Sequence, residues 1–184
     1  MAGDRDERGE GTPLHGGSSA VSTPLDPHLF GEASPCFGCS PTHPIGFRLR
    51  CEKHVDGDAR SVRATFVPRD DMQGPPGVMH GGLVLALADE VAAWTVIGLV
   101  GRFGFTAQVS SKLARPVRIG VPVACTGVIE SQSSRVVKVK VELRQAEAIV
   151  NTSELTFALL DEASAERLLG TKLPDAWRRF ARTP

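Results

Sequence analysis

Residues 80–100 read HGGLVLALADEVAAWTVIGLV, and most of this segment is one long apolar run. The run approaches the length of a membrane span, but Asp89 and Glu90 stand near its middle, where each charge would be costly in lipid. It is apolar nearly all round, which is typical of a helix enclosed by other structure. We therefore expect a buried helix at about 81–100 and no membrane span.

Two strand patterns precede this helix. Phe47, Leu49 and Cys51 alternate with charged residues, as in a half-buried strand of period two. Residues 54–58 (HVDGD) are a turn signal, and residues 61–67 repeat the alternation in a second strand. The chain therefore leads into its helix from a predicted β-hairpin.

Four more strand patterns follow the helix, at 105–113, 121–131, 135–144 and 148–160, and short helical turns are predicted at 163–169 and 175–181. The clearest alternation predicts an inward-facing row: Val137, Val139, Val141 and Leu143. A run of strands after a single helix indicates an α+β fold with a mainly antiparallel sheet. A twisted sheet can curl around the apolar helix and enclose it.

Length and composition indicate one globular domain. The chain has 184 residues, which suffices for a single full core. We expect a disordered tail at residues 1–27 and an irregular lead-in at 28–45. The folded domain is expected at 46–162, followed by a C-terminal helical extension at 163–184. The formal net charge is zero and aromatic residues make up 5%, which argues against nucleic acid as a partner. The first residues lack the apolar segment of a secretory signal, so we expect a cytoplasmic protein.

The start of the predicted helix carries two glycines. Gly81 and Gly82 are poor residues for helix stability, since Gly costs roughly 0.5–1 kcal/mol relative to Ala. They leave backbone N–H groups open to a ligand at the positive end of the helix dipole. A thioester carbonyl that gains negative charge during hydrolysis would be stabilised there. Asp89 is either a structural hydrogen-bonding group or a nucleophile or general base, its basicity raised by burial.

Helix geometry constrains how these groups could cooperate. Gly81 and Asp89 are eight residues apart, about 12 Å along one helix. One substrate carbonyl cannot reach both, so Asp89 would have to come from a second chain related by a two-fold axis. A shared site and a homodimer are therefore predicted together.

These residues resemble the hotdog-fold thioesterases of the phenylacetic-acid-pathway and thioesterase-superfamily-member type. The resemblance is carried by HGG at 80–82, by Asp89-Glu90 and by TAQVSSKLARP at 106–116, and it runs over about 46–160. It implies the hotdog fold, a curved antiparallel sheet wrapped around one long central helix. It also implies an acyl-CoA thioesterase that works as a dimer, or as a dimer of dimers.

The resemblance assigns roles to individual residues. It implies that Gly81 is the oxyanion donor, that Asp89 acts across the dimer, and that Thr106 supports the water or the Asp. His80 either shapes the oxyanion site or only bonds backbone and fixes the turn. Gly82 is expected beside the substrate.

One departure lies just before the HGG segment. Many relatives carry an Asn or Gln there, whereas this chain has Gly74, with Gln73 adjacent as a substitute amide. Val78 and Met79 are expected either to line an acyl channel or to belong to the core. Arg115 is either a solvated charge or a ligand of the CoA phosphates.

The CxxC pair Cys36 and Cys39 raises the question of a metal. His43 and Cys51 are possible further ligands, but a zinc site usually has two close pairs of ligands. The segment 36–47 also resembles a lead-in found ahead of some bacterial hotdog domains, which implies a structural turn covering the acyl pocket. We expect no metal and no cofactor, CoA being part of the substrate.

Three functions remain open at this point. The first is hydrolysis of an acyl-CoA, or of an acyl-carrier-protein thioester. The second is a hotdog hydratase or dehydratase, which needs an Asp/His pair for proton transfer at the acyl α and β carbons. No such pair is found near the helix start. The third is a non-catalytic acyl-CoA binder, which the departure at Gly74 keeps open.

Overall fold

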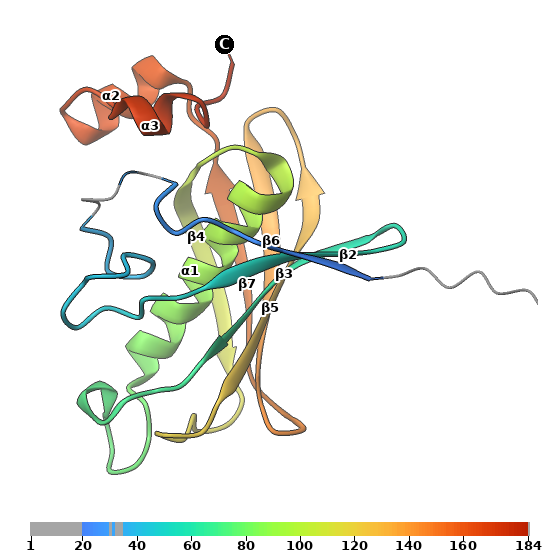
Figure 1. The fold of residues 1–184 in the computed structure, drawn as a ribbon, viewed down its shortest axis with the longest axis vertical. Coiled ribbons are helices and arrows are strands. Elements are labelled where there is room, and N and C mark those ends of the chain that lie inside the picture. Colours follow the sequence, from blue (N-terminus) through green and yellow to red (C-terminus); the bar gives the residue numbers. More distant parts are fainter. Residues whose placement is uncertain (1–19, 30, 32–34, 184) are drawn as a thin grey trace, which may run out of the picture.

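A computed structural model describes residues 20–29, 31 and 35–183. Within these residues, one antiparallel sheet packs against a single long helix (Figure 1). The strands are β1 (Val21–Pro24), β2 (Cys51–Asp56), β3 (Ala59–Phe66), β4 (Phe105–Leu113), β5 (Val123–Gln132), β6 (Val136–Gln145) and β7 (Ala148–Ala158). The helices are η1 (Asp70–Met72, a 3-10 turn), α1 (Gly81–Val100), α2 (Glu162–Leu169) and α3 (Asp175–Arg178). The predicted α+β hotdog fold is confirmed.

The order of strands across the sheet is β1-β2-β3-β5-β6-β7-β4. Sequence alone suggested a run of neighbouring strands after the helix, and for β4 this is wrong. β4 pairs with β7 at the sheet edge, because β3 pairs directly with β5 and leaves no place between them. Helix α1 carries the chain across the face of the sheet to this far edge (Figure 1).

One side of α1 packs into the core. The residues facing the sheet are buried, among them Val84, Leu87, Ala88 and Val91. The predicted inward row on β6 is confirmed, since Val137, Val139, Val141 and Leu143 are all 0% exposed. The other side of α1 is only partly covered by this chain. The expectation of a helix enclosed all round is therefore met on the sheet side alone. By length and composition, α1 is also apolar enough to cross a membrane, as the core helix of a soluble protein can be.

The strand predicted from the alternation of Phe47, Leu49 and Cys51 begins later than expected. Phe47 and Leu49 are buried as predicted, at 4% and 3% exposure, but they precede β2. Arg48 between them has a φ of 53°, the left-handed region, which an extended ladder cannot contain. The predicted turn is also shorter, because β2 continues through Asp56 and only Gly57 and Asp58 form the turn.

The two ends of the chain add elements to the central fold. The prediction of a disordered tail concerns residues 1–19, which lie outside the described residues, and residues 20–27. In the latter, β1 pairs with β2 in register from Val21 opposite Val55 to Pro24 opposite Glu52. At the C-terminus, α2 and α3 form a small second core with the segment that follows α1 (Figure 1). Its buried residues are Phe103, Ala165 and Leu173.

Helix α1 lies close against the sheet at Gly127 of β5. A Cβ at Gly127 would overlap the hydroxyl oxygen of Thr95, and Val91 lies just beyond it. The Thr95 hydroxyl is buried and donates to the Val91 carbonyl oxygen at 2.7 Å. Only glycine allows the helix to lie this close to β5.

We expect Gly127→Ala to lower the free energy of unfolding by about 1–3 kcal/mol, because the added methyl overpacks this contact. Urea denaturation monitored by circular dichroism measures the change. The double variant with Thr95→Ala should lose less than the sum of the two single variants, since removing the hydroxyl makes room for the methyl. A Gly127→Ala protein as stable as wild type would contradict the packing argument.

Candidate active site

The start of α1 has one unused backbone donor. The Gly82 N–H donates to Nδ1 of the His80 side chain at 3.1 Å. The N–H groups of Leu83 and Val84 both donate to the His80 carbonyl oxygen, at 2.9 and 3.1 Å. Among the described residues, nothing accepts from the Gly81 N–H. Of the two glycines singled out in the sequence, Gly81 alone therefore offers a free donor at the positive end of the helix.

His80 is the N-cap of α1. Its side chain accepts a hydrogen bond through Nδ1 and so fixes the turn, which is the simpler of the two roles considered for it. The same bond occupies Gly82, which was expected beside the substrate. His80 thus shapes the donor site by keeping the Gly82 N–H away from a ligand.

A hollow of about 360 Å³ opens beside Gly81. Its wall includes the predicted acyl-channel residues Val78 and Met79, and the predicted phosphate ligand Arg115. Met79 is also part of the core, with 2% exposure, whereas Arg115 is exposed. The structure therefore brings four of the predicted site residues around one cavity. The remaining lining residues are Pro75, Val84, Leu113, Ala114, Pro116 and Val117.

Asp89 has a hydrogen-bonded partner on β4. The Thr106 hydroxyl donates to Oδ1 of Asp89 at 2.7 Å, as the predicted support of Asp89 by Thr106 requires. Asp89 is only partly buried in the single chain, and Thr106 is exposed. The second carboxylate oxygen of Asp89 is thereby left for another group.

The donor and the carboxylate lie toward opposite ends of β4. Gly81 lies next to the Leu113 side chain, whereas Asp89 contacts Thr106. The seven-residue separation of Thr106 and Leu113 corresponds to roughly 23 Å along a strand. One chain therefore does not unite the two predicted halves of the site.

β4 itself is an open edge. It pairs with β7 on one side only, and both Val109 and Leu113 are large apolar residues that are 45% and 50% exposed. An unpaired strand edge with exposed apolar side chains is a ready template for pairing with another strand.

The amide of Gln73 is engaged within the loop before α1. Its Nε2 donates to the Asp70 carbonyl oxygen at 3.1 Å, and its Oε1 accepts from the Gly77 N–H. Gly74 packs directly against His80. Gln73 therefore braces the loop, and the proposed substitution of its amide for the missing Asn or Gln gains no support.

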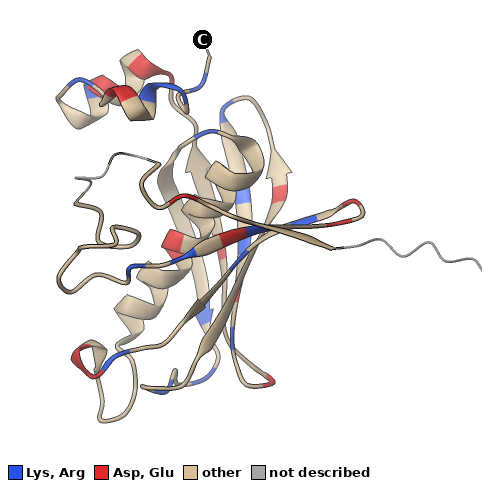
Figure 2. Ribbon diagram, in the orientation of Figure 1, with Lys and Arg blue, Asp and Glu red and all other residues tan. Residues whose placement is uncertain are grey.

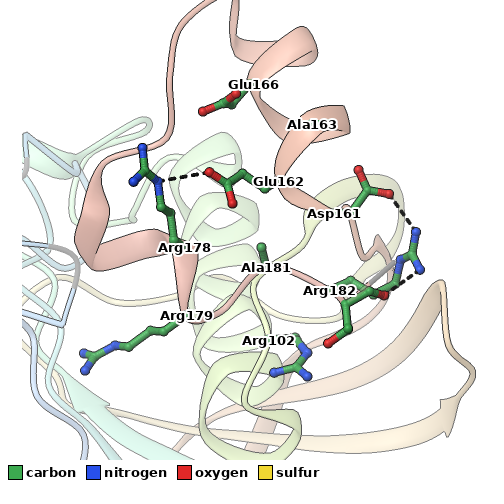
Figure 3. Close-up of a pocket in the computed structure, with 10 residues that line it drawn as sticks. Arg102, Asp161, Glu162, Ala163, Glu166, Arg178, Arg179, Ala181 and Arg182 are labelled. Atoms are coloured by element: carbon green, nitrogen blue, oxygen red, sulfur yellow. Dashed lines mark hydrogen bonds and ion pairs between the residues drawn. The ribbon is translucent and has the colours of Figure 1, made fainter.

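A second hollow, of about 570 Å³, lies between α2 and the C-terminal segment (Figure 3). Its charges are largely paired with one another: Arg178 bonds Glu162 at 3.0 Å, and Arg182 bonds Asp161 at 2.8 Å. None of the predicted site residues lines it.

Glu90 is a charged residue to which the sequence interpretation gave no role of its own. Together with Asp89 it forms the single acidic interruption in α1 (Figure 2). Its Oε1 accepts from the Trp94 indole N–H at 2.8 Å, and burial raises the pKa of Glu90 to about 7. Its spacing from Trp94, four residues on one helix, was the signal available in the sequence.

Comparison with known proteins confirms the resemblance inferred from the HGG segment. Residues 76–150 match the family model of the thioesterase superfamily. A crystal structure of a thioesterase superfamily protein is 28% identical with a TM-score of 0.62, covering 71% of this chain and 64% of that chain. The chain thus spans less than two thirds of the length of this relative. No curated protein gives a significant match.

Two further structures show the same fold. A phenylacetic acid degradation-related protein from Ralstonia eutropha JMP134 is 26% identical with a TM-score of 0.50, covering 53% of this chain and 75% of that chain. A hypothetical thioesterase protein with coenzyme A, from Streptococcus pneumoniae TIGR4, is 22% identical with a TM-score of 0.51. That alignment covers 53% of this chain and 79% of the other.

We expect His80→Ala to destabilise the protein by about 0.5–2 kcal/mol, because the Gly82 N–H loses its cap acceptor. His80→Asn should recover most of this loss, since its side-chain oxygen can accept the same bond. Thermal unfolding of the two variants beside wild type measures the difference. Equal stability of the Ala and Asn variants would show that the cap bond contributes nothing.

Proposed function

We propose that this chain, whose residues 76–150 match the thioesterase superfamily, is a cytoplasmic homodimer that hydrolyses acyl-CoA thioesters. The observation that carries the proposal is the split arrangement along β4. A free N–H at Gly81 lies near one end, and the Asp89–Thr106 pair lies at the other. Each active site would take the donor from one subunit and the carboxylate from its partner.

Antiparallel pairing of β4 with a second copy of itself would unite the two halves. A two-fold axis near the middle of β4 sets the Thr106 end of one strand opposite the Leu113 end of the other. It also covers the exposed side chains of Val109 and Leu113 and satisfies the open strand edge. The partly covered side of α1 would then face the second subunit.

The proposed reaction follows from the two groups. The thioester carbonyl oxygen accepts the Gly81 N–H, which stabilises the negative charge of the tetrahedral intermediate. The partner's Asp89 takes a proton from a water molecule as that water attacks the carbonyl carbon. Thr106 holds Oδ1, so Oδ2 is the oxygen that faces the water. Collapse of the intermediate expels the CoA thiolate and leaves the free acid.

The cavity beside Gly81 suits an acyl thioester. Val78 and Met79 give it an apolar wall, and the exposed Arg115 stands where a phosphate could bind. The Streptococcus pneumoniae protein with coenzyme A shares the fold, which makes CoA esters the first substrates to try. Short, long and aromatic acyl-CoAs together would define the acyl class.

Two variants remove the two proposed groups separately. Asp89→Asn should lower kcat for acyl-CoA by about 10²–10⁴-fold through loss of the general base. Gly81→Pro should lower kcat by about 10²–10³-fold through loss of one oxyanion donor. Proline suits this position, the first of a helix, and the extended backbone of His80 (φ −58°, ψ 131°) can precede it. Gly81→Ala keeps the N–H and is the matched control.

Mixing the two inactive variants tests whether the site is shared. Co-refolded or co-expressed Asp89→Asn and Gly81→Pro chains would form a heterodimer with one intact site, made of Gly81 from the first chain and Asp89 from the second. We expect thiol release to return to a substantial fraction of the wild-type rate. Failure to recover activity, with heterodimers present by mass spectrometry, would contradict the shared site.

A non-catalytic acyl-CoA binder is the alternative that one observation favours. Gly74 replaces the amide found in many relatives, and the neighbouring Gln73 amide is engaged in its own loop. Wild-type protein that binds acyl-CoA in calorimetry but releases no thiol from any ester would favour this alternative over hydrolysis.

A further inference from the structure

Two cysteines and a carboxylate, none of which has a role in the proposed reaction, meet beside the middle of α1. One ligand atom from each of Cys36, Cys39 and Glu90 lies within 4.8 Å of the other two. Cys36 and Cys39 come from the lead-in, which runs alongside α1, and Glu90 comes from the helix itself (Figure 1). The CxxC pair that lacked a partner in the sequence therefore has one in the fold.

The turn between the cysteines is shaped around this carboxylate. The Cys39 N–H donates to Sγ of Cys36 at 3.4 Å, and the Ser40 N–H donates to the Cys36 carbonyl oxygen at 3.1 Å. A Cβ at Gly38 would overlap the Glu90 carboxylate, so only glycine allows the turn to close over it. The loop is held in place by backbone bonds from Phe47 to Phe37 and from Leu49 to Gly38.

Glu90 is held so that one oxygen faces the sulfurs. The Trp94 indole N–H donates to Oε1, and Trp94 is itself only 2% exposed. Oε2 is the atom closest to the Cβ position of Gly38. A hydrogen-bonded second oxygen is the usual way in which a protein orients a metal-binding carboxylate.

The cluster places three ionisable groups side by side, and none of them forms an ion pair with another part of the described chain. A hydrogen bond from the Cys39 thiol lowers the pKa of Cys36, whereas the same bond and burial raise the pKa of Cys39, and burial also raises the pKa of Glu90 to about 7. None of the ion pairs formed by the described residues involves Glu90. Groups that become anionic together in a partly buried position are stabilised by a bound cation.

We propose that Cys36, Cys39 and Glu90 bind one zinc ion, with water as the fourth ligand. Zinc–sulfur and zinc–oxygen bonds of about 2.3 and 2.1 Å in a tetrahedron place ligand atoms roughly 3.5–3.8 Å apart, which the cluster can adopt. Thiolate ligands select zinc over magnesium or calcium. Binding releases the thiol protons of both cysteines to solvent.

His43 and Cys51, the further ligands considered from the sequence, lie outside the cluster. Among the described residues, no fourth His, Cys, Asp or Glu joins the cluster. Cys51 is buried in the core and its sulfur does not belong to the cluster. The ion would therefore fasten the lead-in to α1 at the residue next to Asp89, as a structural clamp.

Metal titration of the reduced full-length chain tests the site directly. After chelation and desalting, Co²⁺ is added, because tetrahedral thiolate-bound Co²⁺ absorbs strongly in the visible and near-ultraviolet. We expect one Co²⁺ per chain, displaced by one Zn²⁺, and protection of two thiols from a thiol reagent when zinc is bound. Zinc should also raise the thermal midpoint of the stripped chain.

Variants separate the cluster from the other cysteines. Cys36→Ser and Cys39→Ser should each weaken Co²⁺ binding at least 100-fold and abolish the thiolate absorption. Glu90→Gln should weaken binding at least tenfold while keeping the absorption. Cys125→Ala, in the core of β5, is the matched control and should bind like wild type.

Three results would overturn the proposal. The first is the absence of Co²⁺ absorption in the reduced wild-type chain with a native circular dichroism spectrum. The second is unchanged binding in the Glu90→Gln variant, which keeps the shape of the side chain. The third is a Cys36–Cys39 disulfide that remains in the purified chain under conditions where cytoplasmic thiols are reduced. Each readout is independent of thioesterase activity.

Discussion

The close packing of α1 against the middle of the sheet sets the position of every candidate functional group. Gly127 brings β5 against Thr95 and Val91, and the row of buried side chains on β6 fills the rest of the interface. Because this contact admits no side chain at Gly127, the face of α1 that carries Val91 and Thr95 lies directly against β5. Apolar packing elsewhere on the helix therefore positions the backbone of Asp89 and Glu90, and hydrogen bonds from Thr106 and Trp94 then orient their carboxylates.

The position of β4 gives the fold its functional asymmetry. Had β4 lain beside β5, both of its edges would be paired and its ends would be covered. Its place at the sheet edge leaves a strand that contacts the Asp89 region near its start and the Gly81 region at its end. The unpaired backbone groups of an edge strand can be satisfied by pairing with another strand. If that strand is β4 of a second chain, the same pairing also brings the two halves of the proposed site together.

The local sequence pattern predicted the long helix and strands well, whereas features that depend on specific hydrogen bonds could not be predicted from it. The bounds of α1 and β4 match the expected ones, because an apolar run between glycines and an alternating run before Arg-Pro are local signals. The left-handed turn at Arg48 is braced by the Arg48 side chain, which donates to the His43 and Pro44 carbonyl oxygens, and the short strand β1 depends on its pairing with β2. Periodicity contains neither of these interactions. For the same reason, the sequence indicated Gly81, Asp89 and Thr106 but not that the Gly82 N–H would be used by its own cap.

The neighbouring carboxylates show how far one helix position can change the chemistry of a side chain. Successive residues of a helix are turned by about 100°, so Asp89 and Glu90 face different surroundings although they are joined by one peptide bond. Asp89 meets a hydroxyl on an exposed strand, where a second chain and a substrate can approach. Glu90 meets an indole and two thiols beneath the lead-in, where water is scarce and a soft cation is favoured. A clamp at Glu90 would hold the helix backbone at Asp89, and in this way the structural site would position the catalytic one.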